Sequence, residues 1–489
     1  MLFNSINYLL FFVVVFVVHF ALPHRFRYLF LLAASYFFYM CWNASYALLM
    51  VTSTLVTYLS GLLIQKYHDA ENRRAMKLCV AVSFIVNLAI LCFFKYINFL
   101  LININELFHL FGSAQSFGMV NVLLPVGISF YTFQALGYTV DVYRQDIKAE
   151  PNVCKYALFV SFFPQLVAGP IERSVNLLPQ IDIPKKFDIE KARKGLTLIA
   201  WGLFMKMVIA DQLSLVVNPI YDRYAEHSGI ALIIATVLFA FQIYCDFAAY
   251  SYIAVGSGKI LGFEFMENFR SPYFATSVAD FWRRWHISLS TWFADYLYIP
   301  LGGNRKGLLR KYANTMLVFL VSGFWHGADW SFVIWGVLNG LLVVGGDILR
   351  SLRKQKTNQP ESKSRVFFKR TVTFLLMNGT WVFFRANNVQ SAFEIFEKIA
   401  TDLSLHSLFS VGIFSLWPNT RVLFTACCAV AALLFVDSMR NRGTIWDEWL
   451  ARQGGFIRWS VYMGLLFSII LFGVYGKIFA NTQFIYFQF

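Results

Sequence analysis

Residues 281–330 read FWRRWHISLSTWFADYLYIPLGGNRKGLLRKYANTMLVFLVSGFWHGADW, and we expect the rest of the chain to be organised around this stretch. It contains two histidines. His286 lies on a basic, tryptophan-rich amphipathic segment, and His326 lies beside a short apolar run that begins after Lys311. Ionisable side chains in or near lipid are costly to keep, so each histidine is a candidate functional residue.

The whole chain has the composition of an integral membrane protein. Of its 489 residues, 58% are hydrophobic and 14% are charged, whereas a soluble globular domain is about 25% charged. Apolar runs of about 18 residues or more recur from end to end, which indicates membrane-spanning helices and not the strands of a barrel. The predicted fold is all-α: one polytopic helical domain over residues 1–489 with about ten to twelve membrane segments, including re-entrant, broken and interfacial helices.

The net charge of +15 comes largely from lysines and arginines in short loops between apolar runs. This distribution is the topology signal of a membrane protein and argues against nucleic-acid binding. The seven cysteines lie mostly in or beside apolar runs, and none has the spacing of a zinc or thioredoxin motif. We therefore predict no metal site and no bound cofactor.

Three segments do not fit simple membrane crossings. Residues 159–180 are short, interrupted by prolines and flanked by basic residues, so we expect a re-entrant element there. Residues 269–311 mix charges, Trp and Tyr with Leu and Ile, as interfacial amphipathic segments do. Residues 312–347 hold apolar runs of 12 and 18 residues between basic flanks, which predicts a core hairpin with His326 at its tip. A 12-residue arm rises only about 18 Å, so the tip is expected inside the membrane.

Each histidine also has a purely structural interpretation. His326 could be a hydrogen-bonded histidine between packed helices, but its expected place at the tip, beside Gly323 and Gly327, favours a reactive group. Histidine suits a general base because its ordinary pKa lies near neutral pH. His286 is either an interfacial anchor or a second polar residue of the same site.

Four neighbouring residues are candidate substrate-binding residues. Trp325 and Asp329 lie beside His326 and could stabilise an oxyanion, as could His286. Arg283 and Arg284 could meet the phosphates of an acidic cytoplasmic donor, because guanidinium groups match phosphate geometry.

Two carboxylates lie in or near apolar runs, namely Glu172 and Asp246. Most such groups pair with an arginine or lysine, and we expect that pairing here. The sequence contains no serine-hydrolase elbow, no His-Glu-x-x-His pair and no Cys/His metal cluster. A metal enzyme or a serine hydrolase is therefore not the predicted class.

Six stretches spread over nearly the whole chain carry a resemblance to a known family. They are MLFNS at 1–5, FFPQLVAGPIER at 162–173, ENFRSPY at 267–273, FWRRWHISLSTWFADYLYIPLGGNR at 281–305, SGFWHGADWSFVIWG at 322–336 and QFIYFQF at 483–489. In this order they resemble the membrane-bound O-acyltransferase (MBOAT) family. The resemblance is closest to its bacterial branch, the membrane subunits of alginate and other polysaccharide O-acetyltransferases. The chain departs from the family pattern at Ala249, Tyr252 and Asn339, where relatives more often have Gly, Asp and His.

The resemblance implies a function and a location. Members of this branch carry an acyl group from a cytoplasmic donor, typically acetyl-CoA, through the bacterial inner membrane to an acceptor on the other side. An extracytoplasmic SGNH-type acetyltransferase or esterase usually completes the transfer to a polysaccharide such as alginate or peptidoglycan. By the same resemblance, His326 corresponds to the catalytic histidine and His286 to the second polar position of the channel.

Two alternatives remain open at the level of sequence. Within the enzyme class, the donor could be a D-alanyl thioester on an acyl carrier protein, used to modify teichoic acid. In another class, the chain could be a transporter without chemistry, in which His326 would be a relay or gating group.

Overall fold

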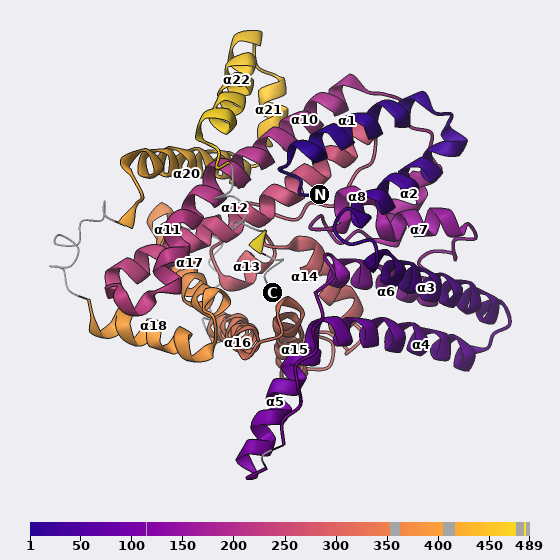
Figure 1. Cartoon of the computed structure of the whole chain (residues 1–489), viewed down its shortest axis with the longest axis horizontal. Coiled ribbons are helices and arrows are strands. Elements are labelled where there is room, and N and C mark those ends of the chain that lie inside the picture. Colours follow the sequence, from indigo (N-terminus) through magenta and orange to yellow (C-terminus); the bar gives the residue numbers. More distant parts are fainter. Residues whose placement is uncertain (114, 353–361, 404–415, 476–483, 486–489) are drawn as a thin grey trace. The chain divides into compact units, whose positions relative to one another are not determined.

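The computed structural model describes residues 1–113, 115–352, 362–403, 416–475 and 484–485, which form helices and loops without a strand (Figure 1). The chain divides into two compact units. Unit 1 comprises Met1–Leu196 and Ala254–Met266, and unit 2 comprises Thr197–Ile253 and Glu267–Phe489. The predicted all-α class is confirmed. The prediction of a single membrane domain stays a prediction.

Unit 1 contains the first nine α-helices and the first turns of the tenth. They are α1 (Ile6–Ala21), α2 (His24–Met40), α3 (Tyr46–Asp69), α4 (Arg73–Leu91), α5 (Ile97–Leu110), α6 (Ile128–Arg144), α7 (Val153–Ser161), α8 (Phe163–Leu166) and α9 (Ser174–Asp182), followed by α10 (Ile189–Phe204). A π-helical turn over Cys92–Tyr96 joins α4 to α5. Helices α3, α4 and α6 pack side by side (Figure 1).

Unit 2 contains the two candidate site histidines, His286 and His326. Its helices are the rest of α10, then α11 (Asp211–Asp222), α12 (Gly229–Leu261, whose last turns from Ala254 belong to unit 1), α13 (Val278–Trp282), α14 (Ile287–Phe293), α15 (Leu308–His326), α16 (Trp330–Leu352), α17 (Lys363–Arg385), α18 (Val389–Thr401), α20 (Thr420–Asn441), α21 (Trp446–Ala451) and α22 (Gly455–Phe472). A π-helical turn over Met205–Ala210 joins α10 to α11. Helices α15 and α16 pack against each other, and α17 packs on α16 (Figure 1).

Seven helical stretches in the described residues are long and apolar enough to cross a membrane. They are Tyr46–Asp69, Arg73–Leu110, Ile189–Asp222, Gly229–Leu261, Trp330–Leu352, Thr420–Asn441 and Gly455–Phe472. Many of their large apolar side chains are exposed, as expected of helices that face lipid. The chain is therefore a multi-pass helical membrane protein.

The segment from Phe162 to Arg173 is non-helical except for the single turn of α8, and all of it is buried. Pro164, Gly169 and Pro170 interrupt the helical hydrogen-bond ladder there. Side chains satisfy two of the backbone groups that this interruption frees. The Phe163 N–H donates to Ser35 Oγ at 3.1 Å, and the Gln134 amide donates to the Phe159 carbonyl at 2.7 Å. Irregular backbone is thus kept inside protein, which is the condition for it to exist at membrane depth.

Helix α15 is longer than the apolar run that indicated it. It begins at Leu308 and has 19 residues, where the apolar run has 12. Gly307, with a φ of +88°, precedes its first turn, and the basic residues that follow are compatible with the helix because their charged ends can reach polar surroundings. A 19-residue arm rises about 28 Å, so the length of this arm alone does not place His326 inside the membrane.

Candidate active site

His286 is positioned by a short stretch of paired backbone between α13 and α14. The Arg270 N–H donates to the Arg284 carbonyl, and the Ile287 N–H donates to the Asn268 carbonyl, each at 2.9 Å. His286 has a φ of +45° and a ψ of +54°, the left-handed conformation that non-glycine residues rarely adopt. Such a conformation costs about 1–3 kcal/mol and persists only where the surroundings hold it in place.

Asn268 holds the His286 side chain and fixes its tautomer. Its Oδ1 atom accepts hydrogen bonds from the Ser288 N–H at 3.2 Å and the Ser288 hydroxyl at 2.9 Å, and it lies 3.1 Å from His286 Nδ1. A backbone N–H can only donate, so the oxygen of the Asn268 amide must face this side. The His286 Nδ1–H is therefore the donor, and Nε2 carries the lone pair.

His286 is neutral over the physiological range. Its side chain is 1% exposed and lies outside the seven candidate spans. Burial lowers the pKa of His286 from 6.5 to about 3, because the charged imidazolium would lose its hydration. A neutral imidazole with an acceptor Nε2 can receive a hydrogen bond from a substrate hydroxyl.

His326 is the last residue of α15, and Gly327 follows it as the C-terminal cap. Its ring is 4% exposed and is surrounded by aromatic rings: the centroid distances are 4.9 Å to Trp335 and 5.6 Å to Phe384. The C-terminal end of a helix carries a partial negative charge, which stabilises a positive imidazolium by about 0.3–2 kcal/mol. A histidine that accepts a proton during a reaction is therefore well placed here.

Trp325 brings the two histidines into one site. Its ring centroid lies 5.0 Å from that of His326 and 5.8 Å from that of His286. Phe247 from α12 also packs edge-on against His286, with ring centroids 4.7 Å apart. The predicted pairing of His286 and His326 thus has a geometric basis in a buried aromatic cluster of unit 2.

The hairpin of α15 and α16 is held together by close backbone contact. A Cβ added at Gly323 would lie 2.4 Å from the Phe332 carbonyl oxygen, and one added at Gly336 would lie 2.4 Å from the Phe319 carbonyl oxygen. Small residues at such crossings let membrane helices pack backbone to backbone. This packing sets the position of His326, three residues after Gly323.

The other predicted site residues have different surroundings. Asp329 Oδ1 accepts the Ser331 N–H at 2.7 Å at the start of α16, which is the arrangement of a helix cap. Arg284 donates to Asp280 at 3.1 Å and to Asn441 at 2.8 Å. Arg283 is exposed and lines a pocket against α15 and α16. The two adjacent arginines therefore have different surroundings, and their role in substrate binding stays a prediction.

Three residues of this site were not predicted from the sequence, namely Asn268, Trp335 and Phe384. Trp335 is 1% exposed, and its indole Nε1–H has no hydrogen-bond partner among the described residues. A buried N–H beside a reactive group is a candidate donor to an oxyanion. The signal in the sequence was only that Asn268 and Trp335 lie in two of the stretches that carry the family resemblance.

A buried charge cluster lies in the same unit as the two candidate histidines. The Lys206 ammonium is 2.9 Å from Asp211 Oδ1 and 2.5 Å from Asp246 Oδ1. The expected pairing of Asp246 is therefore confirmed. In unit 1, the Glu172 carboxylate accepts hydrogen bonds from the Met266 N–H and, at 2.7 Å, from the Asn176 amide.

Phe484 and Ile485, near the C-terminus, contact residues of this charge cluster or their neighbours. The Ile485 N–H donates to Asp246 Oδ2 at 2.8 Å, and Phe484 packs on Tyr250 with centroids 4.3 Å apart. The Phe484 ring also lies 6.0 Å from that of Phe247, which contacts His286. Of the QFIYFQF stretch at 483–489, only these two residues are described.

Comparison with known proteins adds independent information. The sequence model of MBOAT, the membrane-bound O-acyltransferase family, matches residues 80–386. A probable alginate O-acetylase of Pseudomonas aeruginosa is 38% identical over 426 residues, which cover 87% of this chain and 78% of the relative. A peptidoglycan O-acetyltransferase of Helicobacter pylori is 36% identical over 394 residues, covering 75% of this chain and 72% of the relative. A teichoic acid D-alanyltransferase of Streptococcus thermophilus is 27% identical over 299 residues, covering 58% and 71%.

Proposed function

The chain belongs to the membrane-bound O-acyltransferase family, and we propose that it moves an acetyl group from cytoplasmic acetyl-CoA across the bacterial inner membrane to O-acetylate an extracytoplasmic polysaccharide. Its class is that of a multi-pass membrane acyltransferase. The observation that carries the finer proposal is that Trp325 contacts both buried histidines within the matched residues.

In the proposed reaction His326 is the general base. It takes the proton of the hydroxyl that accepts the acetyl group in the membrane, before the extracytoplasmic partner completes the transfer to the polysaccharide. The oxygen of that hydroxyl attacks the thioester carbonyl carbon of acetyl-CoA. The C–S bond then breaks, and the proton held by His326 passes to the sulfur of the leaving CoA. Proton transfer of this kind contributes roughly 10²–10⁴-fold to the rate. The C-terminal end of α15 supports the transient imidazolium.

Two neighbours are assigned supporting roles. His286 Nε2, the lone-pair nitrogen, accepts a hydrogen bond from a second hydroxyl of the acceptor molecule and so orients that molecule. The Trp335 indole N–H donates to the oxyanion that forms on the thioester carbonyl. One such donor is worth about 10²–10³ in turnover in other acyl-transfer enzymes. Trp325 contacts both histidines.

The decisive experiment is substitution of the base. We expect His326→Ala, in membranes that also hold the natural acceptor and its extracytoplasmic partner, to lose acetylation of the polysaccharide by at least a hundredfold. His109→Ala is the matched control, because His109 is an exposed histidine near the end of α5 in unit 1. Acetyl groups on the purified polysaccharide and free CoA are both measured. Full acetylation by His326→Ala would rule out the proposed mechanism.

The relatives define the competing assignments. The names of these relatives include alginate, peptidoglycan and teichoic acid, so the identity of the acceptor and that of the donor are tested separately. Production of free CoA from acetyl-CoA that requires His326 supports the proposed donor. Co-purification of an acylated carrier protein, with no use of acetyl-CoA, favours D-alanyl transfer. Transport without release of CoA favours the non-enzymatic alternative.

We assign completion of the transfer to an extracytoplasmic SGNH-type partner, as the family resemblance implies. Acetylation of the polysaccharide should stop when that partner is removed, while the acetyl-CoA-dependent step in the membrane stays measurable. Acetylation at an unchanged rate without any partner would contradict this assignment.

A further inference from the structure

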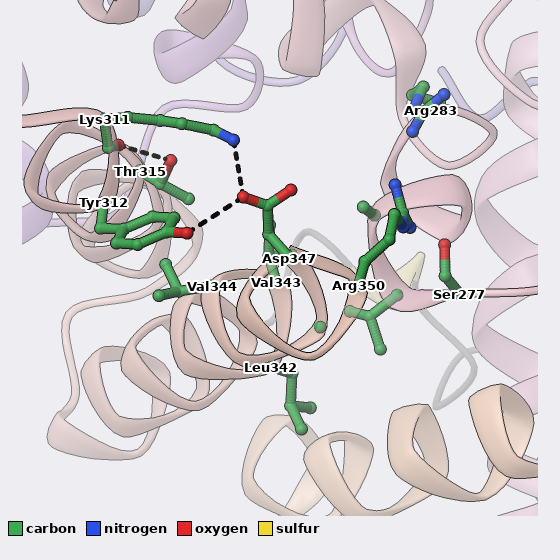
Figure 2. Close-up of a pocket in the computed structure, with 13 residues that line it drawn as sticks. Ser277, Arg283, Lys311, Tyr312, Thr315, Leu342, Val343, Val344, Asp347 and Arg350 are labelled. Atoms are coloured by element: carbon green, nitrogen blue, oxygen red, sulfur yellow. Dashed lines mark hydrogen bonds and ion pairs between the residues drawn. The ribbon is translucent and has the colours of Figure 1, made fainter. Parts of the chain in front are cut away.

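A second polar site lies at the opposite end of the α15–α16 hairpin from His326. It is a pocket of about 210 Å³ lined by the start of α13, the first turns of α15 and the last turns of α16. Figure 2 shows its charged side chains: Lys311 and Asp347 lie on one side, and Arg283 and Arg350 lie on the other. None of the histidines lines it.

The charges of this pocket are not balanced. Lys311 Nζ lies 2.6 Å from Asp347 Oδ2, and the Tyr312 hydroxyl donates to the same carboxylate oxygen at 3.3 Å. The single carboxylate is therefore used by Lys311 and Tyr312 (Figure 2). Arg283 and Arg350 form no hydrogen bond or ion pair with the residues that the structure describes, and Arg350 interacts with Asp347 only electrostatically. The four charged groups carry a net charge of +2.

Two guanidinium groups on one wall of a small pocket repel each other unless an anion lies between them. Guanidinium also presents paired N–H donors whose geometry matches the oxygens of a phosphate. The hydroxyls of Ser277 and Thr315 line the same pocket and add polar atoms at its edge. We propose that this pocket, built by Arg283, Arg350 and the Lys311–Asp347 pair, binds a phosphate group carried by the acyl donor or by an anionic lipid headgroup.

The hairpin provides a measure of the distance between the two sites. Thr315 lines the pocket and His326 ends the same helix, so about 11 residues, or roughly 17 Å, separate them along α15. Lys311 is about 22 Å away by the same measure. An extended pantetheine arm has a comparable length. Binding of the phosphates here would therefore allow the thioester of CoA to approach His326, and this choice of source rests on the proposed function.

Binding measurements on the intact protein test the proposal. The protein is placed in phosphatidylcholine nanodiscs and titrated with CoA, with pantetheine (which has no phosphate) and with inorganic phosphate. We expect Arg283→Gln/Arg350→Gln to weaken CoA binding about tenfold or more, as loss of charge-assisted hydrogen bonds should. Pantetheine binding should be unchanged. Lys363→Gln/Arg365→Gln is the matched control, because it removes two exposed charges from the start of α17 outside the pocket.

A second arm identifies the source of the phosphate. Nanodiscs with phosphatidylglycerol are compared with pure phosphatidylcholine by the thermal unfolding midpoint. A phosphatidylglycerol effect that Arg283→Gln/Arg350→Gln abolishes, with CoA affinity unchanged, would assign the pocket to a lipid headgroup. If CoA, inorganic phosphate and phosphatidylglycerol act equally on the wild type and on this double variant, the phosphate site is disproved.

The binding experiments test the pocket separately from the acetyl-transfer reaction of the proposed function. If arginine-dependent CoA binding is found but no acetyl group is transferred, the pocket stands and the proposed reaction fails. If acetyl transfer requires His326 but the binding of CoA, phosphate and lipid is the same with and without the two arginines, the proposed reaction is supported and the pocket proposal is wrong.

Discussion

At the scale of single residues, His286 shows how one backbone angle can matter for chemistry. Its left-handed conformation is held by pairing of residues on either side with the strand-like stretch at Asn268–Arg270. An unusual backbone conformation at a buried histidine is an observation from which function is inferred, because strain of this kind concentrates at active sites. The Asn268 amide then selects which ring nitrogen keeps its lone pair.

We predict that Asn268→Ala lowers the turnover number about tenfold to a hundredfold with little change in KM. The variant leaves His286 free to change tautomer and rotamer, but it does not alter the binding surface for the donor. Asn268→Asp retains the acceptor and adds a negative charge, which would raise the pKa of His286. Its activity should therefore acquire a dependence on pH between 5 and 7 that the wild type lacks at this residue. Wild-type turnover and pH profile in both variants would show that Asn268 has no positioning role.

Single residues also show which contacts of the site could be predicted from the sequence and which could not. Trp325 and His326 are adjacent, so their shared site followed from the chain itself. Arg283 and Arg284 are adjacent too, yet they point to different partners, because the short helix α13 ends there and turns the chain. Asn268 lies 18 residues before its histidine, and only tertiary pairing brings them together. A pattern of types and spacings does not contain that contact.

At the scale of elements, the α15–α16 hairpin positions His326. The sequence predicted two apolar arms with a glycine-containing tip, and the structure has two helices joined by three residues, Gly327 to Asp329. The first arm starts six residues earlier than the apolar run, because a helix continues past its apolar face when charged side chains can reach polar surroundings. The apolar run therefore indicates which part of the segment the membrane tolerates, but it does not give the residue at which α15 begins.

We predict that Gly323→Ala disturbs the site without any contact with substrate. The new Cβ would meet the Phe332 carbonyl oxygen at 2.4 Å, so the two helices must separate locally. Overpacking of this kind costs about 1–3 kcal/mol, and the shift is passed to His326 within one turn. The acetyl-transfer rate and the thermal midpoint should both fall.

Gly345→Ala on α16 is the control for that experiment. Nothing lies within 4 Å of a Cβ at this position. Alanine favours a helix over glycine by about 1 kcal/mol, so this variant should be as stable as the wild type or more stable. Equal effects of the two substitutions would contradict the assigned role of close packing at Gly323.

At the scale of the whole molecule, each of the two units contains a buried titratable group with a strongly shifted pKa outside the candidate spans. In unit 1, burial raises the pKa of Glu172 from 4.5 to about 7. In unit 2, burial lowers the pKa of His286 from 6.5 to about 3. The cause is the same, since burial disfavours the charged form of both groups, but the consequences for stability have opposite signs.

We predict that Glu172 and His286 make opposite contributions to the pH dependence of stability between pH 5 and 7. Between 4.5 and 7 the native state keeps a proton on Glu172 that the unfolded chain loses, so the contribution of Glu172 to stability falls as pH rises. Below 6.5 the unfolded chain protonates His286 and the native state does not, so the contribution of His286 to stability falls as pH drops. Each effect amounts to about 2 kcal/mol across this window. Because they oppose each other, a single unfolding midpoint for the whole chain would conceal both.

Hydrogen exchange, which reports on each region separately, is the measurement that resolves them. After correction for intrinsic rates, amides of α9 should be better protected at pH 5 than at pH 7, and amides of α14 should be better protected at pH 7. Glu172→Gln should remove the first difference and leave the second, and His286→Gln should do the reverse. If both variants change both regions alike, the two units share one cooperative unfolding step. If neither variant changes either region, these two groups do not control the pH dependence.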